Sequence, residues 1–236
     1  MSTKPIVEFK NVTKEYTIGE HKLRAVDDMS FQILEGEFVV ILGPSGAGKS
    51  TVLNLLGGMD TVTSGEILVD GRNVAGLGDN ALTKYRAENV GFVFQFYNLI
   101  PTLTAYENIA LTKDIVKNPI DAGALLEMVG LKDHARQFPS QLSGGEQQRI
   151  SIARAIAKNP AILLCDEPTG ALDSETGIII LTMLQNMSRE RNKAVIIVTH
   201  NAVLAEAADR VIRIRNGKIR DITENASPKA VSEVSW

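Results

Sequence analysis

The chain has 236 residues, of which 44% are hydrophobic and 22% charged, with a formal net charge of −3. This composition is typical of a globular chain with an ample core, and the lack of a basic excess argues against nucleic acid as a partner. A single cysteine excludes an internal disulfide, the apolar runs fall short of the ~18 residues that span a bilayer, and the N-terminal stretch lacks a signal-peptide pattern, so we expect a cytoplasmic chain.

The first predicted elements are strands. Residues 6–14 and 29–33 alternate apolar and polar side chains, which predicts half-buried strands, and residues 38–42 are continuously apolar, as in a buried strand. Strand and helix then alternate, which predicts an α/β fold with a parallel sheet. The further strands are expected at 90–94, 161–165 and 194–199, with helices at 145–158 and 174–191.

Two dipeptides, Asp70-Gly71 and Asn216-Gly217, favour tight hairpin turns. The strands beside them are predicted to be antiparallel additions at sheet edges. Between residues 97 and 160 no strand is predicted, and helical windows at 105–117, 121–129 and 145–158 are separated by prolines, which indicates an inserted helical subdomain. After about residue 221 the hydrophobic period is lost, so we expect a loosely ordered tail.

The segment 43–50, GPSGAGKS, fits the P-loop pattern and follows the buried strand at 38–42. Its glycines allow the backbone N–H groups to wrap around phosphate oxygens at the start of a helix. Lys49 is predicted to reach the β- and γ-phosphates, and Ser50 to bind Mg²⁺. The alternative is a glycine-rich turn without a ligand. The residues predicted to bind the nucleotide are Gly43, Pro44, Ser45, Gly46, Ala47, Gly48, Lys49, Ser50 and Thr51.

Two adjacent carboxylates, Asp166 and Glu167, follow the apolar strand at 161–165. Open α/β sheets bind ligands at the carboxyl ends of their strands, so we expect both acids to face the P-loop. In that position Asp166 holds Mg²⁺, while Glu167 orients and deprotonates the water that attacks the γ-phosphate. Without a P-loop, a solvated strand end would be the better interpretation.

Residues 142–147 have the sequence LSGGEQ, which resembles the LSGGQ signature of ABC ATPases with glutamate in place of the glutamine. The order of P-loop, Gln95, signature, acid pair and His200 is similar to that family over nearly the whole chain, from residue 7 to about 218. The resemblance implies an ABC ATPase domain over 1–224, followed by a tail at 225–236. The domain is expected to contain a RecA-like P-loop NTPase core with a mixed, mainly parallel sheet. An antiparallel β subdomain and a helical subdomain at about 97–160 are expected beside that core.

The resemblance also implies a second copy of the ATPase. In the family, the signature of one subunit faces the P-loop of another, so that ATP is clamped in a nucleotide-dependent dimer. Ser143, Gly144, Gly145 and Glu146 would then bind the nucleotide held by the partner copy, helped by the positive end of the following helix. From the residues alone, a serine and two glycines before a helix are a flexible N-cap.

Four further residues are assigned through the same resemblance. Gln95 matches the Q-loop glutamine that reaches the metal or the attacking water, and His200 matches the switch histidine that contacts the γ-phosphate. Asp173 matches the D-loop, with an N-cap for the next helix as the alternative. Tyr16, predicted just after the first strand, matches the aromatic residue that stacks on adenine, with packing on the core as the alternative.

The segment 96–101 is unusually apolar for a loop. We expect it to receive a helix of a permease, and burial within the helical subdomain is the competing interpretation. His21 and His134 lie in polar stretches without a partner motif and are predicted at the surface.

The resemblance implies a transport-coupled ATPase that uses ATP and Mg²⁺. Residues 53–71, 90–109 and 166–177 are similar to the ATPases of macrolide exporters, lipoprotein-release systems, antimicrobial-peptide resistance transporters and the cell-division complex. That group implies a permease on a separate chain, with an extracytoplasmic domain, and a peripheral location on the inner face of the membrane. An importer ATPase is one alternative and would often carry a C-terminal domain of ~50 residues. A non-transport ABC protein, with two cassettes or a long coiled coil, is the other.

Overall fold

The computed structural model describes residues 4–113 and 115–234. The strands are β1 (Pro5–Ile18), β2 (His21–Leu34), β3 (Phe38–Leu42), β4 (Ser64–Val69), β5 (Arg72–Asn73), β6 (Val90–Val93), β7 (Ile162–Asp166), β8 (Ala194–Thr199), β9 (Arg210–Arg215) and β10 (Lys218–Glu224). The helices are α1 (Lys49–Leu56), α2 (Asp79–Asn89), α3 (Ala105–Ala110), α4 (Ala122–Met128), α5 (Gly144–Ala157) and α6 (Ser174–Arg191), with short 3-10 turns at η1 (Lys132–His134), η2 (Pro139–Gln141), η3 (Ala202–Glu206) and η4 (Val231–Glu233).

Within the described residues the strands form two sheets. One has four strands in the order β2-β1-β4-β5 and is antiparallel, and the other has six strands in the order β10-β9-β3-β8-β7-β6. In the larger sheet β9, β3, β8, β7 and β6 run parallel, while β10 pairs antiparallel with β9. The predicted mixed, mainly parallel sheet beside an antiparallel sheet is therefore confirmed.

Strand β3 separates two apolar cores, because successive side chains of a strand point to opposite faces of the sheet. Val39 and Ile41 belong to the core that includes α1 and the four-stranded sheet. Val40 and Leu42 belong to the core that includes α5 and α6. Burial on both faces explains why residues 38–42 are continuously apolar, and it holds the loop after β3 firmly against the body of the molecule.

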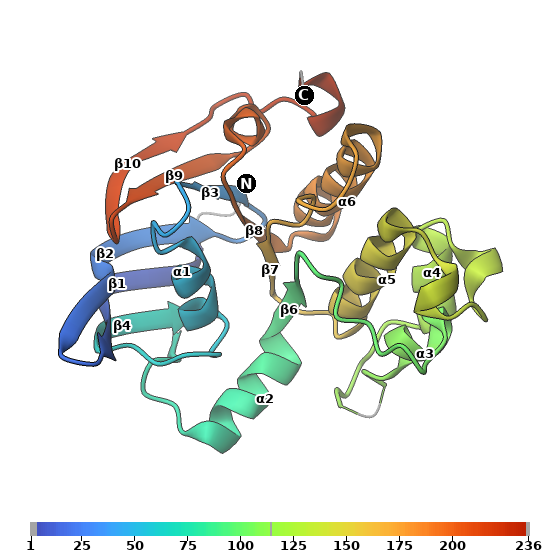
Figure 1. Cartoon of the computed structure of the whole chain (residues 1–236), viewed down its shortest axis with the longest axis horizontal. Coiled ribbons are helices and arrows are strands. Elements are labelled where there is room, and N and C mark those ends of the chain that lie inside the picture. Colours follow the sequence, from blue (N-terminus) through green and yellow to red (C-terminus); the bar gives the residue numbers. More distant parts are fainter. Residues whose placement is uncertain (1–3, 114, 235–236) are drawn as a thin grey trace.

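Figure 1 shows α3, α4 and α5 together on the side of the molecule away from β1, β2 and β4. These helices form the predicted helical insertion, and no strand interrupts them among the described residues between 97 and 160. No helix of the described part of the chain is both long and apolar enough to cross a bilayer.

Several predicted boundaries differ from the structure. The helix expected over 105–117 ends at Ala110; beyond its end Leu111 and Ile115 are 41% and 58% exposed, and residue 114 lies outside the described residues. Strand β1 continues to Ile18, and α5 begins one residue earlier than expected. Helix α2 was not predicted at all.

Both predicted hairpins form, and their turns use residues with positive φ, namely Asp70 and Gly71, and Asn216 and Gly217. The hairpin β9–β10 is an edge addition to the large sheet, as expected. The hairpin β4–β5 also lies at a sheet edge, as predicted, but at the edge of the separate four-stranded sheet, where β4 pairs with β1.

The expectation of a loosely ordered tail is wrong for the residues described, which end at 234. Val231 and Val234 are 0% and 5% exposed and join the core beside α6. Gln185 of α6 donates to the carbonyl of Lys229 over 3.0 Å and accepts from the N–H of Val231 over 3.1 Å. These contacts hold the described part of the tail against α6, while Trp236 lies outside the described residues.

Candidate functional site

The P-loop lies between the C-terminal end of β3 and the first turn of α1. Gly48, the N-cap of α1, has φ 103°, and a side-chain β-carbon there would lie 2.2 Å from the carbonyl oxygen of Ala25. A β-carbon at Gly43 would lie 2.4 Å from the carbonyl oxygen of Ile214. Only glycine fits at these two positions, so the loop packs tightly against β2 and β9.

A cavity of about 530 Å³ opens beside this loop. It is lined by five of the predicted nucleotide-binding residues together with Tyr16, and also by residues of β2 and of the β9–β10 turn. The lining residues are Tyr16, Leu23, Arg24, Ala25, Gly46, Gly48, Lys49, Ser50, Thr51, Asn216 and Gly217. Gly43 and Pro44 instead line a neighbouring groove with His200. Ser45 is exposed, and Ala47 is buried beneath the loop.

Lys49 is buried at the base of this cavity. Its ammonium group donates to the carbonyl oxygens of Gly43 and Pro44 over 2.8 Å and 3.1 Å. The charge is therefore held inside the curve of the loop, where the first N–H groups of α1 also point. Gly48 provides no side-chain cap for those N–H groups, so the start of α1 is suited to an anion.

Asp166 ends β7 opposite the start of α1. Ser50 Oγ donates to Asp166 Oδ1 over 3.4 Å, and burial raises the pKa of the Asp166 carboxyl above its usual range. The described residues contain no group of three or more His, Cys, Asp or Glu side chains arranged to hold a metal. One carboxylate and one hydroxyl fit Mg²⁺, which prefers oxygen ligands and usually takes its other ligands from phosphate and water. A cation there would also offset the partly buried charge of Asp166.

Glu167 is held by three hydrogen-bonding contacts at the end of β8. Thr199 Oγ1 donates to Glu167 Oε2 over 2.8 Å, and the backbone N–H of His200 donates to Oε1 over 3.0 Å. His200 Nδ1 lies 2.8 Å from the same Oε1. The backbone of Glu167 has φ 45°, an uncommon conformation for a residue with a side chain. Contacts of the surrounding residues therefore fix both the backbone and the side chain of Glu167.

Gln95 follows β6 and is partly buried. A β-carbon at Gly170 would lie 3.0 Å from the Nε2 atom of Gln95. Because the N–H of Gly170 donates to the carbonyl oxygen of Glu167 over 3.0 Å, Gln95 lies against the turn that follows the acid pair. The structure therefore brings Lys49, Ser50, Asp166, Glu167, His200 and Gln95 to one edge of the sheet, as the sequence predicted for strand ends.

The signature forms the N-terminus of α5, and none of its residues lines the P-loop cavity. Ser143 is the N-cap and makes a reciprocal capping box with Glu146, whose Oε2 accepts from both the N–H and the hydroxyl of Ser143 over 2.7 Å and 2.8 Å. These two bonds lower the pKa of Glu146. Ser143 is exposed, so this capped end faces solvent.

The two glycines of the signature allow close packing. A β-carbon at Gly145 would lie 2.4 Å from Cγ2 of Thr176, and one at Gly144 would lie 2.7 Å from the hydroxyl of Tyr97. Asp173, predicted to act as the D-loop acid, is the N-cap of α6 and accepts from the N–H of Thr176 over 2.9 Å. The signature thus lies directly against the first turn of α6.

His134 lies at the surface, as predicted, with 34% of its side chain exposed, but it has a contact that was not predicted. Its Nε2 lies 3.3 Å from Glu146 Oε1, and its Nδ1 is buried without a hydrogen-bond partner among the described residues. The contact joins η1 to α5 across a loop, which the polar sequence around His134 did not indicate. His21 is exposed, as predicted.

Tyr16 lies within β1 and not after it, which corrects its predicted position. Its hydroxyl donates to Asp60 Oδ2 over 2.6 Å, and the ammonium of Lys14 lies 4.9 Å from the ring centroid. Burial, followed by the bond to Asp60, raises the pKa of the phenol. The ring is therefore fixed at the cavity wall.

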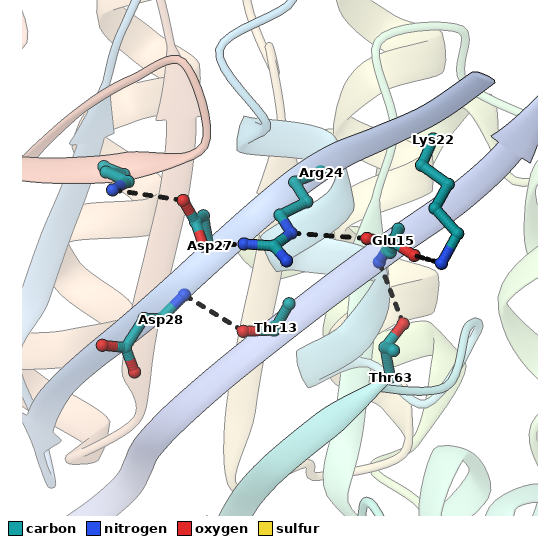
Figure 2. A network of polar contacts seen from close by, with 8 residues as sticks. Thr13, Glu15, Lys22, Arg24, Asp27, Asp28 and Thr63 are labelled. Carbon is teal, nitrogen blue, oxygen red and sulfur yellow. Dashed lines mark hydrogen bonds and ion pairs between the residues drawn. The ribbon is translucent and has the colours of Figure 1, made fainter.

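Figure 2 shows the polar contacts that stiffen this wall. Glu15 pairs with Lys22 over 2.8 Å and with Arg24 over 3.3 Å, and Arg24 also reaches Asp27 over 3.4 Å. The N–H of Glu15 donates to the hydroxyl of Thr63 over 2.9 Å. These contacts tie β1 to β2 and to the start of β4 beside the cavity, although each exposed ion pair adds little stability by itself.

The apolar segment after Gln95 lines a separate groove of about 330 Å³. Phe96 is 74% exposed there, and Leu99 and Pro101 contribute to the same groove with Pro139 of η2. The alternative of full burial in the helical subdomain is therefore excluded for Phe96. An exposed aromatic side chain in an apolar groove is typical of a surface that contacts another protein.

Comparisons with known proteins agree with this architecture. A family model described as ABC transporter matches residues 26–170. The chain is 45% identical over 224 residues to an uncharacterized ABC transporter ATP-binding protein of Thermotoga maritima, over 93% of this chain and 95% of that protein. It is 42% identical over 228 residues to the macrolide export ATP-binding/permease protein MacB of Haemophilus ducreyi, over 94% of this chain and 32% of that protein.

Among solved structures, the chain is similar to the ATP-binding cassette MJ0796 of Methanocaldococcus jannaschii, a dimer in a post-hydrolysis state bound to ADP and Pi. The TM-score is 0.85 and the identity 43%, over 92% of this chain and 98% of that chain. The fold and the strand-end site thus define an ATP-binding cassette. The chain belongs to the ABC transporter family, as an ATP-binding member, and it spans about half the length of the curated Mycoplasma relatives it matches.

Three features of the site were not predicted from the sequence. Thr199 binds Glu167, and Asp60 binds Tyr16. These contacts were not predicted because the partners lie far apart along the chain. Asn216 and Gly217 line the cavity, and the sequence identified them only as a turn. The position of Thr199 at the end of the strand before His200 was the one local signal for a role in the site.

Proposed function

We propose that this chain binds and hydrolyses ATP as a nucleotide-dependent dimer of two copies, and that the hydrolysis powers a separate membrane permease of the export or mechanotransmission type. One observation carries the proposal. Glu167 is anchored by Thr199 and His200 at the same sheet edge where Lys49 and the Ser50–Asp166 pair surround the phosphate-binding loop. A cation, a metal-binding pair and a fixed carboxylate are the groups that phosphoryl transfer to water requires.

In the proposed mechanism the P-loop N–H groups and Lys49 bind the β- and γ-phosphates, and Tyr16 stacks on the adenine. Mg²⁺, when bound by Ser50 and Asp166, neutralises phosphate charge as it develops. Glu167 accepts a proton from the attacking water at a carboxylate oxygen, while the water oxygen bonds to the γ-phosphorus and ADP leaves. With Nδ1 directed at Glu167, His200 keeps Nε2 free to contact the γ-phosphate.

The signature supports the dimer part of the proposal. Ser143, Gly144 and Gly145 lie at a solvent-facing helix end outside the P-loop cavity, so they complete a nucleotide site only across an interface between two copies. Glu146 and Asp173 belong to the same face. The dimeric MJ0796 cassette, 43% identical to this chain, is consistent with this arrangement.

The permease part of the proposal is supported by the groove at Phe96 and by a relative. The MacB protein of Haemophilus ducreyi, 42% identical over 94% of this chain, is named as a macrolide export ATP-binding/permease protein. We propose that a permease segment inserts beside Phe96 and Leu99, that this permease carries an extracytoplasmic domain, and that the chain is peripheral on the cytoplasmic face of the membrane. Nucleic acid is not a proposed partner.

The hydrolysis step is tested with Glu167→Gln, which retains the size of the side chain but removes the base. Turnover should fall by roughly 10²–10⁴-fold while ATP binding is retained, and size-exclusion chromatography with ATP should show a dimer. The matched control is Glu190→Gln, at an exposed position near the end of α6. Turnover by Glu167→Gln at the rate of that control would overturn the assigned role.

The partner is tested by purifying the tagged Glu167→Gln chain with ATP from solubilised membranes and identifying bound proteins by mass spectrometry. A permease with a large extracytoplasmic domain is the expected result. A compact importer permease, or a soluble partner alone, would contradict the export or mechanotransmission assignment without affecting the hydrolysis proposal.

A further inference from the structure

Gln148 is the fifth residue of α5, and it is completely buried. Its Nε2 donates to the carbonyl oxygen of Pro168 over 2.7 Å and lies 3.4 Å from that of Phe94. Pro168 directly follows Glu167, and Phe94 directly precedes Gln95. A single amide on the signature helix therefore reaches the backbone of both loops that carry the hydrolytic side chains.

The turn that Gln148 contacts is conformationally demanding. Glu167 has φ 45°, a conformation that is unfavourable for a residue with a side chain and persists only where neighbouring contacts enforce it. The N–H of Glu167 donates to the carbonyl oxygen of Val198 over 3.0 Å, which fixes the turn from β8. Gln148 holds the following peptide from the opposite side, through the carbonyl of Pro168.

The amide of Gln148 is not arranged for stability alone. Its Oε1 is buried without a hydrogen-bond partner among the described residues. Burying an unpaired acceptor is unfavourable, whereas an apolar side chain of similar size would fill the space without that penalty. Gln148 has this unfavourable unpaired acceptor and also binds a loop of the candidate active site. Its presence is therefore better explained by positioning that loop than by filling the core.

Helix α5 links this contact to the signature. Ser143 caps the helix through Glu146, and Gln148 follows within two turns, so both lie on one rigid segment about 8 Å long. Further along the same helix, Arg154 donates to the carbonyl oxygens of Asn98 and Tyr97 over 2.7 Å and 3.0 Å. The segment 94–98, which includes Gln95, is therefore tied to α5 at both ends.

We propose that Gln148 is a positioning residue for hydrolysis, which couples the signature helix to the Glu167 turn of the same chain. When the signature engages the nucleotide of the partner copy, the position of α5 sets that of the Pro168 carbonyl and hence of the Glu167 carboxylate. Each copy then becomes competent for hydrolysis only when its own signature is engaged. This inference rests on the proposed function, because it requires an ATP-hydrolysing dimer.

The test uses Gln148→Met, which retains length and apolar volume but removes the donor. We expect kcat for ATP to fall roughly 10-fold, as for the loss of one or two hydrogen bonds, with KM changed less than 2-fold. In the Glu167→Gln background, the same substitution should leave the ATP-trapped dimer intact. Gln148→Glu is the second variant: at this fully buried position its carboxyl should stay protonated and donate to one of the two carbonyls, so kcat should fall less than in Gln148→Met.

The matched control is Gln185→Met, which removes another buried glutamine from another helix. Gln185 Nε2 also donates to two carbonyl oxygens, over 3.1 Å and 3.0 Å, but these belong to Ala207 after η3 and to Lys229 in the C-terminal tail. This variant should lower Tm and leave kcat unchanged, which separates destabilisation from positioning.

Unchanged kcat in folded Gln148→Met would overturn the inference. So would loss of the trapped dimer in the same variant, because Gln148 would then serve the signature and not the catalytic turn. If the unmodified chain does not hydrolyse ATP in this assay, the proposed function fails and the inference fails with it. If the wild type is active and Gln148→Met has the same kcat, only the inference fails.

Discussion

Two glycine-containing helix starts differ in how they satisfy their first N–H groups. Helix α1 begins after Gly48, which provides no side-chain cap, whereas α5 begins after Ser143, which forms a reciprocal capping box with Glu146. The first start is open to an anion, and the second is closed by its own side chains until another ligand reaches it. The difference supports the proposal that one chain holds a nucleotide by its P-loop and that a second copy completes the site.

The largest effect is expected at the open start. Lys49→Ala removes the only side-chain ammonium placed within the described P-loop, so ATP affinity should fall roughly 100-fold or more, because charge-assisted bonds to phosphate are lost. Isothermal titration with MgATP measures the change. Lys84→Ala, at an exposed position of α2, is the control. Equal affinity in the two variants would remove the distinction between the helix starts.

The closed start is tested with Ser143→Ala and Ser143→Asn. Both remove the hydroxyl, and in the Glu167→Gln background both should weaken ATP-driven dimerisation at least 10-fold while single-copy ATP binding is unchanged. Only the alanine variant should lose about 1 kcal/mol of stability, because asparagine caps a helix as well as serine does. Sedimentation and urea unfolding provide the two measurements. Dimerisation restored by asparagine would mean that capping, and not the hydroxyl, is what the interface requires.

A smaller effect is expected where Tyr16 is proposed to stack on the adenine base of ATP. Tyr16→Ala should weaken ATP binding about 10-fold, since a stacked ring contributes roughly 1–3 kcal/mol per base. Tyr16→Phe loses the bond to Asp60 but retains the ring, so its affinity should remain near that of the wild type. Fluorescence titration with a labelled nucleotide distinguishes the two variants. A phenylalanine variant as weak as the alanine variant would contradict the stacking role.

The smallest effect concerns the opposite end of α5. Burial, with Arg154 and Arg86 nearby, lowers the pKa of Lys158 from 10.5 to about 8. Between these values the unfolded chain binds more protons than the folded chain, so this contribution to stability is present above pH 10.5 and is lost as the pH falls through 8. From pH 8 to pH 9 the gain should be up to about 1 kcal/mol.

Lys158→Met removes this titration, so the difference in unfolding free energy between wild type and variant should change with pH in that window. Urea unfolding at the two pH values measures it. A constant difference would mean that the ammonium of Lys158 is not disfavoured by burial.

How much of the site the sequence predicted depends on how local each feature is. The P-loop is contiguous, and its glycines at 43 and 48 are required by close contacts with the backbone of Ile214 and Ala25. The acid pair and His200 could be placed because parallel strands bring their carboxyl ends to one edge. The Tyr16 ring was predicted, but its position within β1 was not, since the length of an alternating strand is set by its partners.

The contacts that the sequence did not predict join distant segments. The contact between His134 and Glu146, and the tail packed against Gln185, depend on how loops cross the surface of helices. Neither leaves a periodic signal, because each involves one or two polar side chains.

The sequence by itself determined the α/β alternation, the P-loop, the signature and the order of the candidate site residues, because these follow from hydrophobic period and from contiguous motifs. The tertiary structure decided the separation of the two sheets and the contacts of Gln148, which cross 54 residues to Phe94 and 20 to Pro168. Such contacts form only when separate elements pack together, and their partners are backbone carbonyls, which every residue carries and no sequence pattern marks.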